Sequence, residues 1–128
     1  MKTTIPAIEK AIAGEIKTVE ELGMNLTLFW AYKKSKYAGN NIINFYDVIW
    51  NKDIDEIAKN LKENGVTEFS ISSNFSGLIT TIAEFEKHGF IMAGIIDVTE
   101  TYTDLTTNKP AVAKAIRMVL KASLPGLL

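Results

Sequence analysis

The chain has 128 residues, of which 47% are hydrophobic and 23% are charged, and its formal net charge is −1. This length and apolar content allow one domain with a buried core and argue against intrinsic disorder. The charge predicts no general attraction to nucleic acid or anionic membranes, and the absence of cysteine excludes disulfides and Cys-based metal sites. No apolar run is long enough to span a bilayer and the N-terminus lacks a signal-peptide layout, so we expect a cytoplasmic protein that makes no membrane contact.

The first third of the chain carries a long amphipathic stripe. From Ile5 onward its apolar residues are spaced three or four apart, which predicts helix. Either one helix reaches about Lys36, or two helices join near Gly14 or Gly23, because each glycine weakens a helix by roughly 1 kcal/mol relative to alanine. The stripe contains Ile12, Ile16, Val19, Leu22, Leu26 and Phe29. This helical arm, residues 1–36, either packs across the protein's own sheet or forms a seam for a second copy or another protein.

At the end of the stripe, basic residues are interleaved with aromatic ones. The segment is WAYKKSKY, and its candidate nucleic-acid contacts are Trp30, Lys33, Lys34, Lys36 and Tyr37. Lysines that neutralise phosphates, placed between rings that stack on bases, are typical of nucleic-acid binding. The alternative, which we favour, is a helix C-terminus whose lysines complement the helix dipole and whose aromatics anchor the helix end to the body.

Residues 42–50, IINFYDVIW, are apolar and rich in β-branched and aromatic side chains, and they form either a strand or a docking segment. Tyr46 and Trp50 line a pocket or, as is more usual for aromatics, belong to the core. A helix follows at residues 53–64 and ends at Asn64 and Gly65. Its predicted apolar face consists of Ile54, Ile57, Ala58 and Leu61.

Residues 66–90 predict a strand near 66–72, a polar loop, a helix at 75–88 and a turn at Gly89. The loop is a candidate anion site, because backbone N–H groups at a helix start attract phosphate or carboxylate. Its candidate residues are Ser72, Ser73, Asn74 and Ser76. The alternative, which we favour, is an ordinary helix cap made by serine side chains.

Residues 90–102 alternate in the manner of a strand, whereas residues 111–121 are compatible with either a strand or a helix. We predict a strand at 111–120 that pairs with residues 92–102 as a long hairpin. The sequence therefore predicts one α+β domain. The helical arm comes first, and the α/β body at 42–121 follows in the order α-β-α-β-β, with a small, mostly antiparallel sheet.

Three segments, INFYDVIWNKDIDEIAKNLKENGV, FSISSNFSGLITTIAEFEKHGF and YTDLTTNKPAVAKAIRM, occur in this order. Together they resemble a family of small uncharacterised proteins carried by integrative elements and prophages of clostridia and related Firmicutes. The resemblance covers about residues 42–120 and implies a mobile-element context without an established activity. Small proteins in that context include anti-CRISPR inhibitors that occlude a nuclease, so the resemblance implies a protein-binding role.

A shorter segment, FEKHGF at residues 85–90, is similar to the turn before the C-terminal hairpin of GNAT acetyltransferases. That similarity implies an enzyme that uses coenzyme A. Two features depart from the pattern: Leu78 stands where an asparagine is expected, and the Gly-rich loop that binds the pyrophosphate is absent.

The titratable residues form no recognisable catalytic or metal motif. His88, the only histidine, and Glu84 would supply just two metal ligands. Asp97, Glu100 and Asp104 lie near one strand end, but nothing in the sequence directs two of them at one point. We therefore predict a non-enzymatic protein without metal or cofactor. We expect it to bind another protein, with a host-defence nuclease as one candidate, and to form a homodimer through the arm. The alternatives are a nucleic-acid-binding module and a remnant of a GNAT-like acyltransferase.

Overall fold

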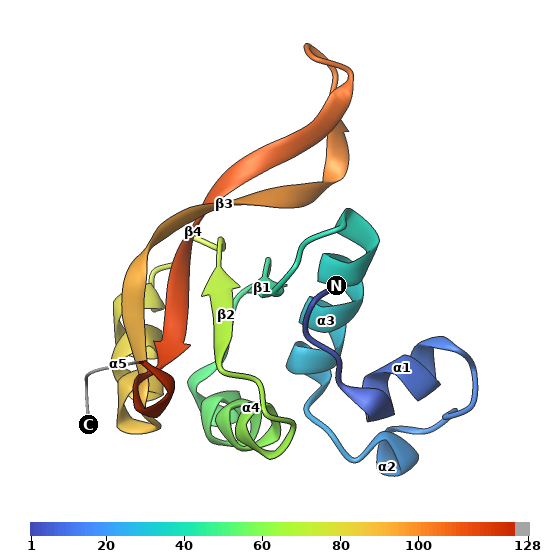
Figure 1. The fold of residues 1–128 in the computed structure, drawn as a ribbon, viewed down its shortest axis with the longest axis vertical. Coiled ribbons are helices and arrows are strands. Elements are labelled where there is room, and N and C mark those ends of the chain that lie inside the picture. Colours follow the sequence, from blue (N-terminus) through green and yellow to red (C-terminus); the bar gives the residue numbers. More distant parts are fainter. Residues whose placement is uncertain (125–128) are drawn as a thin grey trace.

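The computed structural model describes residues 1–124, which form a four-stranded sheet with helices (Figure 1). The helices are α1 (Pro6–Ile12), α2 (Val19–Leu22), α3 (Leu26–Ala38), α4 (Asn51–Glu63) and α5 (Leu78–Lys87), with a short 3-10 turn, η1 (Lys121–Ser123). The strands are β1 (Ile43–Phe45), β2 (Glu68–Ile71), β3 (Phe90–Asp104) and β4 (Lys109–Leu120). The order α4-β2-α5-β3-β4 confirms the predicted α+β body.

The sheet has the strand order β1-β2-β4-β3 and is mixed. β1 and β2 are parallel, because α4 carries the chain back to the start of the sheet between them. The β2–β4 and β4–β3 pairs are antiparallel, so the long C-terminal hairpin is confirmed. Within residues 42–50, a strand is formed only by the three residues of β1, and a loop leads from it to α4.

The prediction of one long N-terminal helix is wrong, because the segment forms three short helices. Gly14 and Gly23 adopt φ angles of 81° and 62°, a left-handed conformation that other residues rarely reach, and the chain turns at both. The side chains of Thr18 and Asn25 then cap α2 and α3, each accepting a hydrogen bond from a backbone N–H three residues further on. The alternative of two helices predicted one interruption, near Gly14 or Gly23, and the structure has an interruption at each of these glycines.

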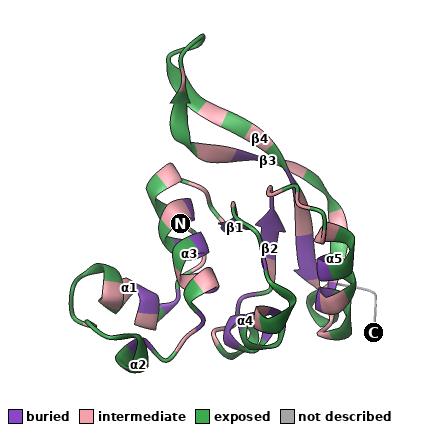
Figure 2. Cartoon of the chain, turned by 180° about the vertical axis from the view of Figure 1, so that it is seen from behind, coloured by how far each residue is buried: buried purple, intermediate pink, exposed green. Residues whose placement is uncertain are grey.

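A single hydrophobic cluster joins the N-terminal segment to the sheet. The rings at its centre are Phe45, Phe69, Phe85 and Phe90, from four different elements. The ring centroid of Phe69 lies 5.5, 4.8 and 5.2 Å from those of the other three. Ile5 and Ile8 before and within α1 are fully buried in the same cluster. Figure 2 shows buried residues in β2 and the adjacent half of β4, whereas the far half of the hairpin is largely exposed.

A buried polar network joins α3, β1 and β2. The Asn44 side chain accepts a hydrogen bond from Ser70 Oγ at 2.7 Å and donates one to Ser72 Oγ at 2.9 Å. Ser35 Oγ accepts from the backbone N–H of Asn44 and donates to its carbonyl, at 2.8 and 3.2 Å. Asn44, Ser35 and Ser70 are fully buried, and hydrogen bonds of this kind are what make buried polar groups tolerable. The network fixes how β1 lies against β2 and α3.

The far half of the β3–β4 hairpin leaves the sheet and extends beyond the loop that follows α3 (Figure 1). Register shifts between Met92 and Ile95 and between Thr99 and Thr103 interrupt the pairing of β3 with β4. Further along, the Asn40 side chain pairs with both the backbone N–H and the carbonyl of Thr99, each at 2.9 Å. The Tyr46 hydroxyl donates to the same carbonyl at 2.7 Å. These bonds attach the hairpin to the segment between α3 and the β1–α4 loop.

A polar contact joins α1 to α3. The Tyr32 hydroxyl donates a hydrogen bond to the Glu9 carboxylate, and the Lys36 ammonium pairs with the same carboxylate. The Lys36 and Tyr32 hydrogen bonds hold the pKa of Glu9 below its usual value. Burial, together with the neighbouring Glu9 carboxylate, raises the pKa of Tyr32 to about 12. Near neutral pH the contact therefore consists of a carboxylate, an ammonium and a neutral phenol.

We expect acid to weaken this contact. A carboxyl group whose pKa is lower in the folded chain stabilises the fold above its unfolded pKa, and the contribution is lost as the pH falls through the folded value. Glu9→Gln should therefore destabilise the protein at about pH 7 and destabilise it less at about pH 3, because the effect declines as Glu9 becomes protonated. Urea-unfolding midpoints at both pH values measure the difference, with Glu20→Gln on the exposed side of α2 as the control. An effect of Glu9→Gln that is the same at both pH values would contradict the expectation.

Candidate functional site

The six residues of the predicted seam do not share one helix face, because three helices replace the long one. Three of them pack in or against the core: Ile16, Leu22 and Phe29. The other three are exposed on three different helices: Ile12, Val19 and Leu26. The N-terminal segment thus contributes to the protein's own core, and a homodimer stays a prediction.

The lysines of the basic and aromatic segment lie near the end of α3, where partners occupy them. Lys34 pairs with Asp47 at 2.5 Å, and Lys36 pairs with Glu9. The Lys33 ammonium lies 5.2 Å from the ring centroid of Trp30, a cation–π distance. Two of the three positive charges are therefore balanced by carboxylates of this chain.

The aromatic residues of the same segment behave differently from one another. Tyr32 is buried and anchors α3 to α1, as the favoured interpretation of a helix end requires. Trp30 and Tyr37 do not anchor the helix, since 48% and 81% of their surfaces are exposed. For these two rings the anchoring interpretation is wrong.

The serine-rich loop does not cap α5. That helix starts after Gly77, and no side chain accepts a hydrogen bond from its first turn. Ser72 instead bonds to Asn44, and it lies with Ser73 and Asn74 along a groove beside β4. Ser76 lines a different groove. The favoured serine cap is therefore wrong, and the four candidate residues are not gathered at one point.

Two grooves, one of them the groove that Ser76 lines, share Val48 in the loop between β1 and α4. The first has a volume of about 410 Å³ and is lined by Trp30 of α3 and by Phe45 of β1. The second has a volume of about 390 Å³ and is lined by Trp50, before α4, and by Phe75, before α5. We call the residues Trp30, Val48 and Trp50 the tryptophan surface. It contains both tryptophans of the chain.

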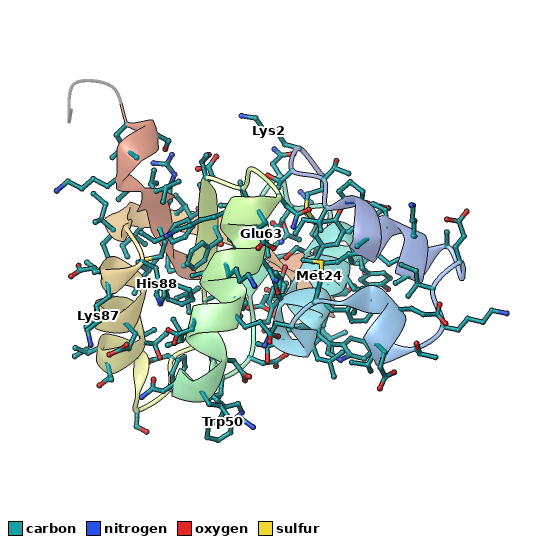
Figure 3. All side chains as sticks on the ribbon, turned by 90° about the horizontal axis from the view of Figure 1, so that it is seen from below. Lys2, Met24, Trp50, Glu63, Lys87 and His88 are labelled. Carbon is teal, nitrogen blue, oxygen red and sulfur yellow. The ribbon has the colours of Figure 1, made fainter. Side chains whose placement is uncertain are left out.

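The loop after β1 explains how these side chains come to be exposed. Ile49 is buried and anchors the loop, while its neighbours Val48 and Trp50 are 38% and 62% exposed. Trp50 directly precedes α4, and Figure 3 shows it at that end of the helix, extending away from the body. The expectation that Trp50 belongs to the core is wrong, and the pocket alternative is correct. Trp30 lies on the exposed side of α3, next to the buried Ala31.

The two grooves differ in their electrostatics. In the first, the ion pair between Lys34 and Asp47 leaves the lining without net charge. In the described part of the chain, no charged side chain lines the second groove, which includes residues at the starts of both α4 and α5, namely Asn51 and Gly77. Thr81 also lines it, and within residues 1–124 its Oγ1 is the buried side-chain polar atom without a hydrogen-bond partner.

The titratable residues singled out in the sequence lie elsewhere. His88 Nε2 lies 2.7 Å from Asp55 Oδ1, so His88 does not pair with Glu84, which contacts Lys87 at 2.8 Å. The described part of the chain contains no group of three or more His, Cys, Asp or Glu side chains that could hold a metal ion. None of the helices described in residues 1–124 is both long enough and apolar enough to cross a membrane.

Comparison with known proteins identifies a family. A family model described as a domain of unknown function, DUF7698, matches residues 27–120. No curated protein and no solved structure matches the chain. The match runs from α3 to β4 and so includes all four strands and the tryptophan surface, while α1 and α2 lie outside it. The expectation of an uncharacterised family is confirmed, and the chain belongs to the DUF7698 family.

Proposed function

We propose that this protein acts by binding another protein and that the tryptophan surface makes the contact. One observation carries the proposal: Trp30 and Trp50 are both about half exposed or more, at two grooves that share Val48. Tryptophan is the residue type most enriched among those that dominate protein–protein binding energy, and such residues act next to pockets that they and their partners fill. Apolar groups gathered on a surface in this way are typical of interaction sites.

The first class of partner to test is a host-defence nuclease. The resemblance to proteins of integrative elements and prophages suggests this class, and it would place the encounter in the cytoplasm. An inhibitor that occludes a nuclease needs a contact surface and no catalytic group of its own. A homodimer is compatible with this role, and the solution mass from light scattering tests it on the same samples.

A nucleic-acid-binding module is the second candidate, and the exposed rings of Trp30 and Tyr37 on either side of Lys33 favour it. It is the weaker one, because Lys34 and Lys36 are already paired with carboxylates and the net charge is −1. Binding to single strands that weakens steeply with salt and is lost on Lys33→Glu would favour it over protein binding. Nothing in residues 1–124 supports the acyltransferase alternative over these two.

The double substitution Trp30→Ala with Trp50→Ala should abolish partner binding and leave the fold intact. Truncating a hot-spot residue costs about 2 kcal/mol or more, which is roughly thirtyfold in Kd for each tryptophan. The measurement is inhibition of, and affinity for, a panel of defence nucleases, with circular dichroism to verify the fold.

The matched control is Tyr37→Ala with Ile79→Ala, which removes two exposed apolar side chains outside the two grooves. We expect this control to bind like the wild type. Binding by the tryptophan variant that equals the wild type would exclude the tryptophan surface as the contact. If no nuclease in the panel binds the wild type, the nuclease class is wrong.

A further inference from the structure

We infer that the second groove, between the starts of α4 and α5, is a binding pocket for a carboxylate that has an apolar group beside it. The inference rests on the proposed function, since it states the chemistry that a partner would present to this part of the tryptophan surface. It does not depend on the identity of the partner.

Two helix starts line this groove, and neither has a side-chain cap. The residue before α4 is Trp50, whose indole offers no acceptor to the first-turn N–H groups, and the residue before α5 is Gly77, which has no side chain. The first turn of a helix leaves backbone N–H groups without partners inside the helix, and the helix dipole makes that end positive. A bound anion satisfies both requirements. Here two such ends contribute residues to one groove, Asn51 from α4 and Gly77 from α5.

Thr81 provides an independent indication of a ligand. Its side chain is fully buried, it lines the same groove, and its Oγ1 has no hydrogen-bond partner within residues 1–124. Thr81 lies four residues after Gly77, about one helical turn further along, and both residues line the groove. Buried hydroxyl groups almost always have a partner. A ligand oxygen in the groove would supply an acceptor.

The surroundings select a singly charged carboxylate over a phosphate. Among residues 1–124, no lysine or arginine lines the groove, while α4 carries Asp53 and Asp55 in its first two turns. Those two carboxylates are directed to other partners, to Asn25 Nδ2 at 3.3 Å and to His88 at 2.7 Å. They still oppose a second negative charge on the ligand. Trp50 and Phe75 form the apolar wall, which suits an apolar group attached next to the carboxylate.

The test is an NMR titration of the full-length, ¹⁵N-labelled protein with three probes: N-acetyl-leucine, N-acetyl-leucinamide and inorganic phosphate. The amide has the same apolar group as the acid but lacks its charge. We expect N-acetyl-leucine to shift the backbone N–H signals of residues 51–52 and 79–80, since the N–H of Leu78 already donates to the Phe75 carbonyl, and to bind about tenfold more tightly than the amide. Phosphate should bind more weakly than the acid. Equal affinity for acid and amide would overturn the inference, and so would tighter binding of phosphate.

Variants of α5 then separate a ligand contact from a purely structural role. Thr81→Val keeps the shape of the side chain and removes the hydroxyl, so it should lower the acid-to-amide preference about threefold or more, whereas Thr81→Ser should retain it. The control is Thr80→Val, on the exposed side of the same helix. A preference that is unchanged in Thr81→Val would remove the hydroxyl from the site and overturn the assignment.

The two proposals can fail separately. If N-acetyl-leucine does not bind but the Trp30→Ala, Trp50→Ala variant still loses nuclease binding, the proposal of a carboxylate pocket is wrong and the proposal of a protein-binding surface stands. If N-acetyl-leucine binds as expected but the double tryptophan variant still binds the nuclease, the proposal of a carboxylate pocket stands and the contact surface proposed for the partner is wrong.

Discussion

A chain that lacks residues 1–36 is expected not to fold. The deletion removes α1, α2 and most of α3, and with them fully buried side chains of the core. These include Ile5, Ile8, Leu28 and Tyr32. Burial of one such side chain stabilises a fold by about 1.5–3 kcal/mol, and a domain of this size is stable by only about 5–15 kcal/mol in all. The loss of four therefore removes most or all of the stability.

Circular dichroism and light scattering of the truncated and full-length chains measure this effect. The matched control is Ile12→Ala with Val19→Ala, which alters exposed positions of the same segment and should leave the fold intact. A truncated chain that is folded and monomeric, from a full-length chain that is a dimer, would contradict the prediction. It would make the segment an assembly arm after all.

The body of the fold could be predicted because its local patterns agree with its tertiary packing. In α4 the four residues of the predicted apolar face are all buried: Ile54, Ile57, Ala58 and Leu61. The alternation of residues 90–102 likewise predicts β3, whereas the pattern of residues 111–121 allows a strand or a helix, and the antiparallel pairing with β3 decides between them. In α4 and β3 a short stretch of sequence contains the information that decides the structure.

The N-terminal segment could not be predicted in the same way. A spacing of three or four residues is equally compatible with one helix and with several. A glycine costs a helix only about 1 kcal/mol, so tertiary packing decides whether the helix continues through Gly14 and Gly23. Packing of Ile5, Ile8 and Leu22 into one cluster requires the chain to turn at both glycines.

The candidate site could be predicted only in part: Trp30, Trp50 and Ser76 were singled out, but not their places in the two grooves. Ser72 is a plausible helix cap in the sequence, but its hydroxyl bonds to Asn44, a residue 28 positions away that no local pattern connects to it. Trp50 is the last residue of an apolar run. That run does not reveal that β1 ends at Phe45, or that Ile49 is buried while Trp50 is exposed. No sequence signal marks the two helix starts, because Asn51 and Ser76 both look like caps, whereas the observed cap positions are Trp50 and Gly77.

The substitution Phe69→Ala is expected to be the most destabilising single change in the aromatic cluster. Phe69 is fully buried on β2, a strand with neighbours on both sides, and its ring contacts the rings of Phe45, Phe85 and Phe90. Removing a buried phenylalanine side chain costs about 3–5 kcal/mol, because apolar burial is lost and a cavity remains. The loss of paired rings adds about 0.5–1.5 kcal/mol for each pair.

Urea unfolding followed by circular dichroism measures the change in the free energy of unfolding. Phe69→Leu should recover much of the loss because it refills most of the cavity, and Tyr37→Ala, at an exposed aromatic, should change stability by no more than about 0.5 kcal/mol. The four rings come from β1, β2, α5 and β3, so a cavity at Phe69 weakens the contacts of every layer at once. We therefore expect one cooperative transition at a lower urea concentration. A separate early transition would instead mean that the elements around the cluster unfold independently.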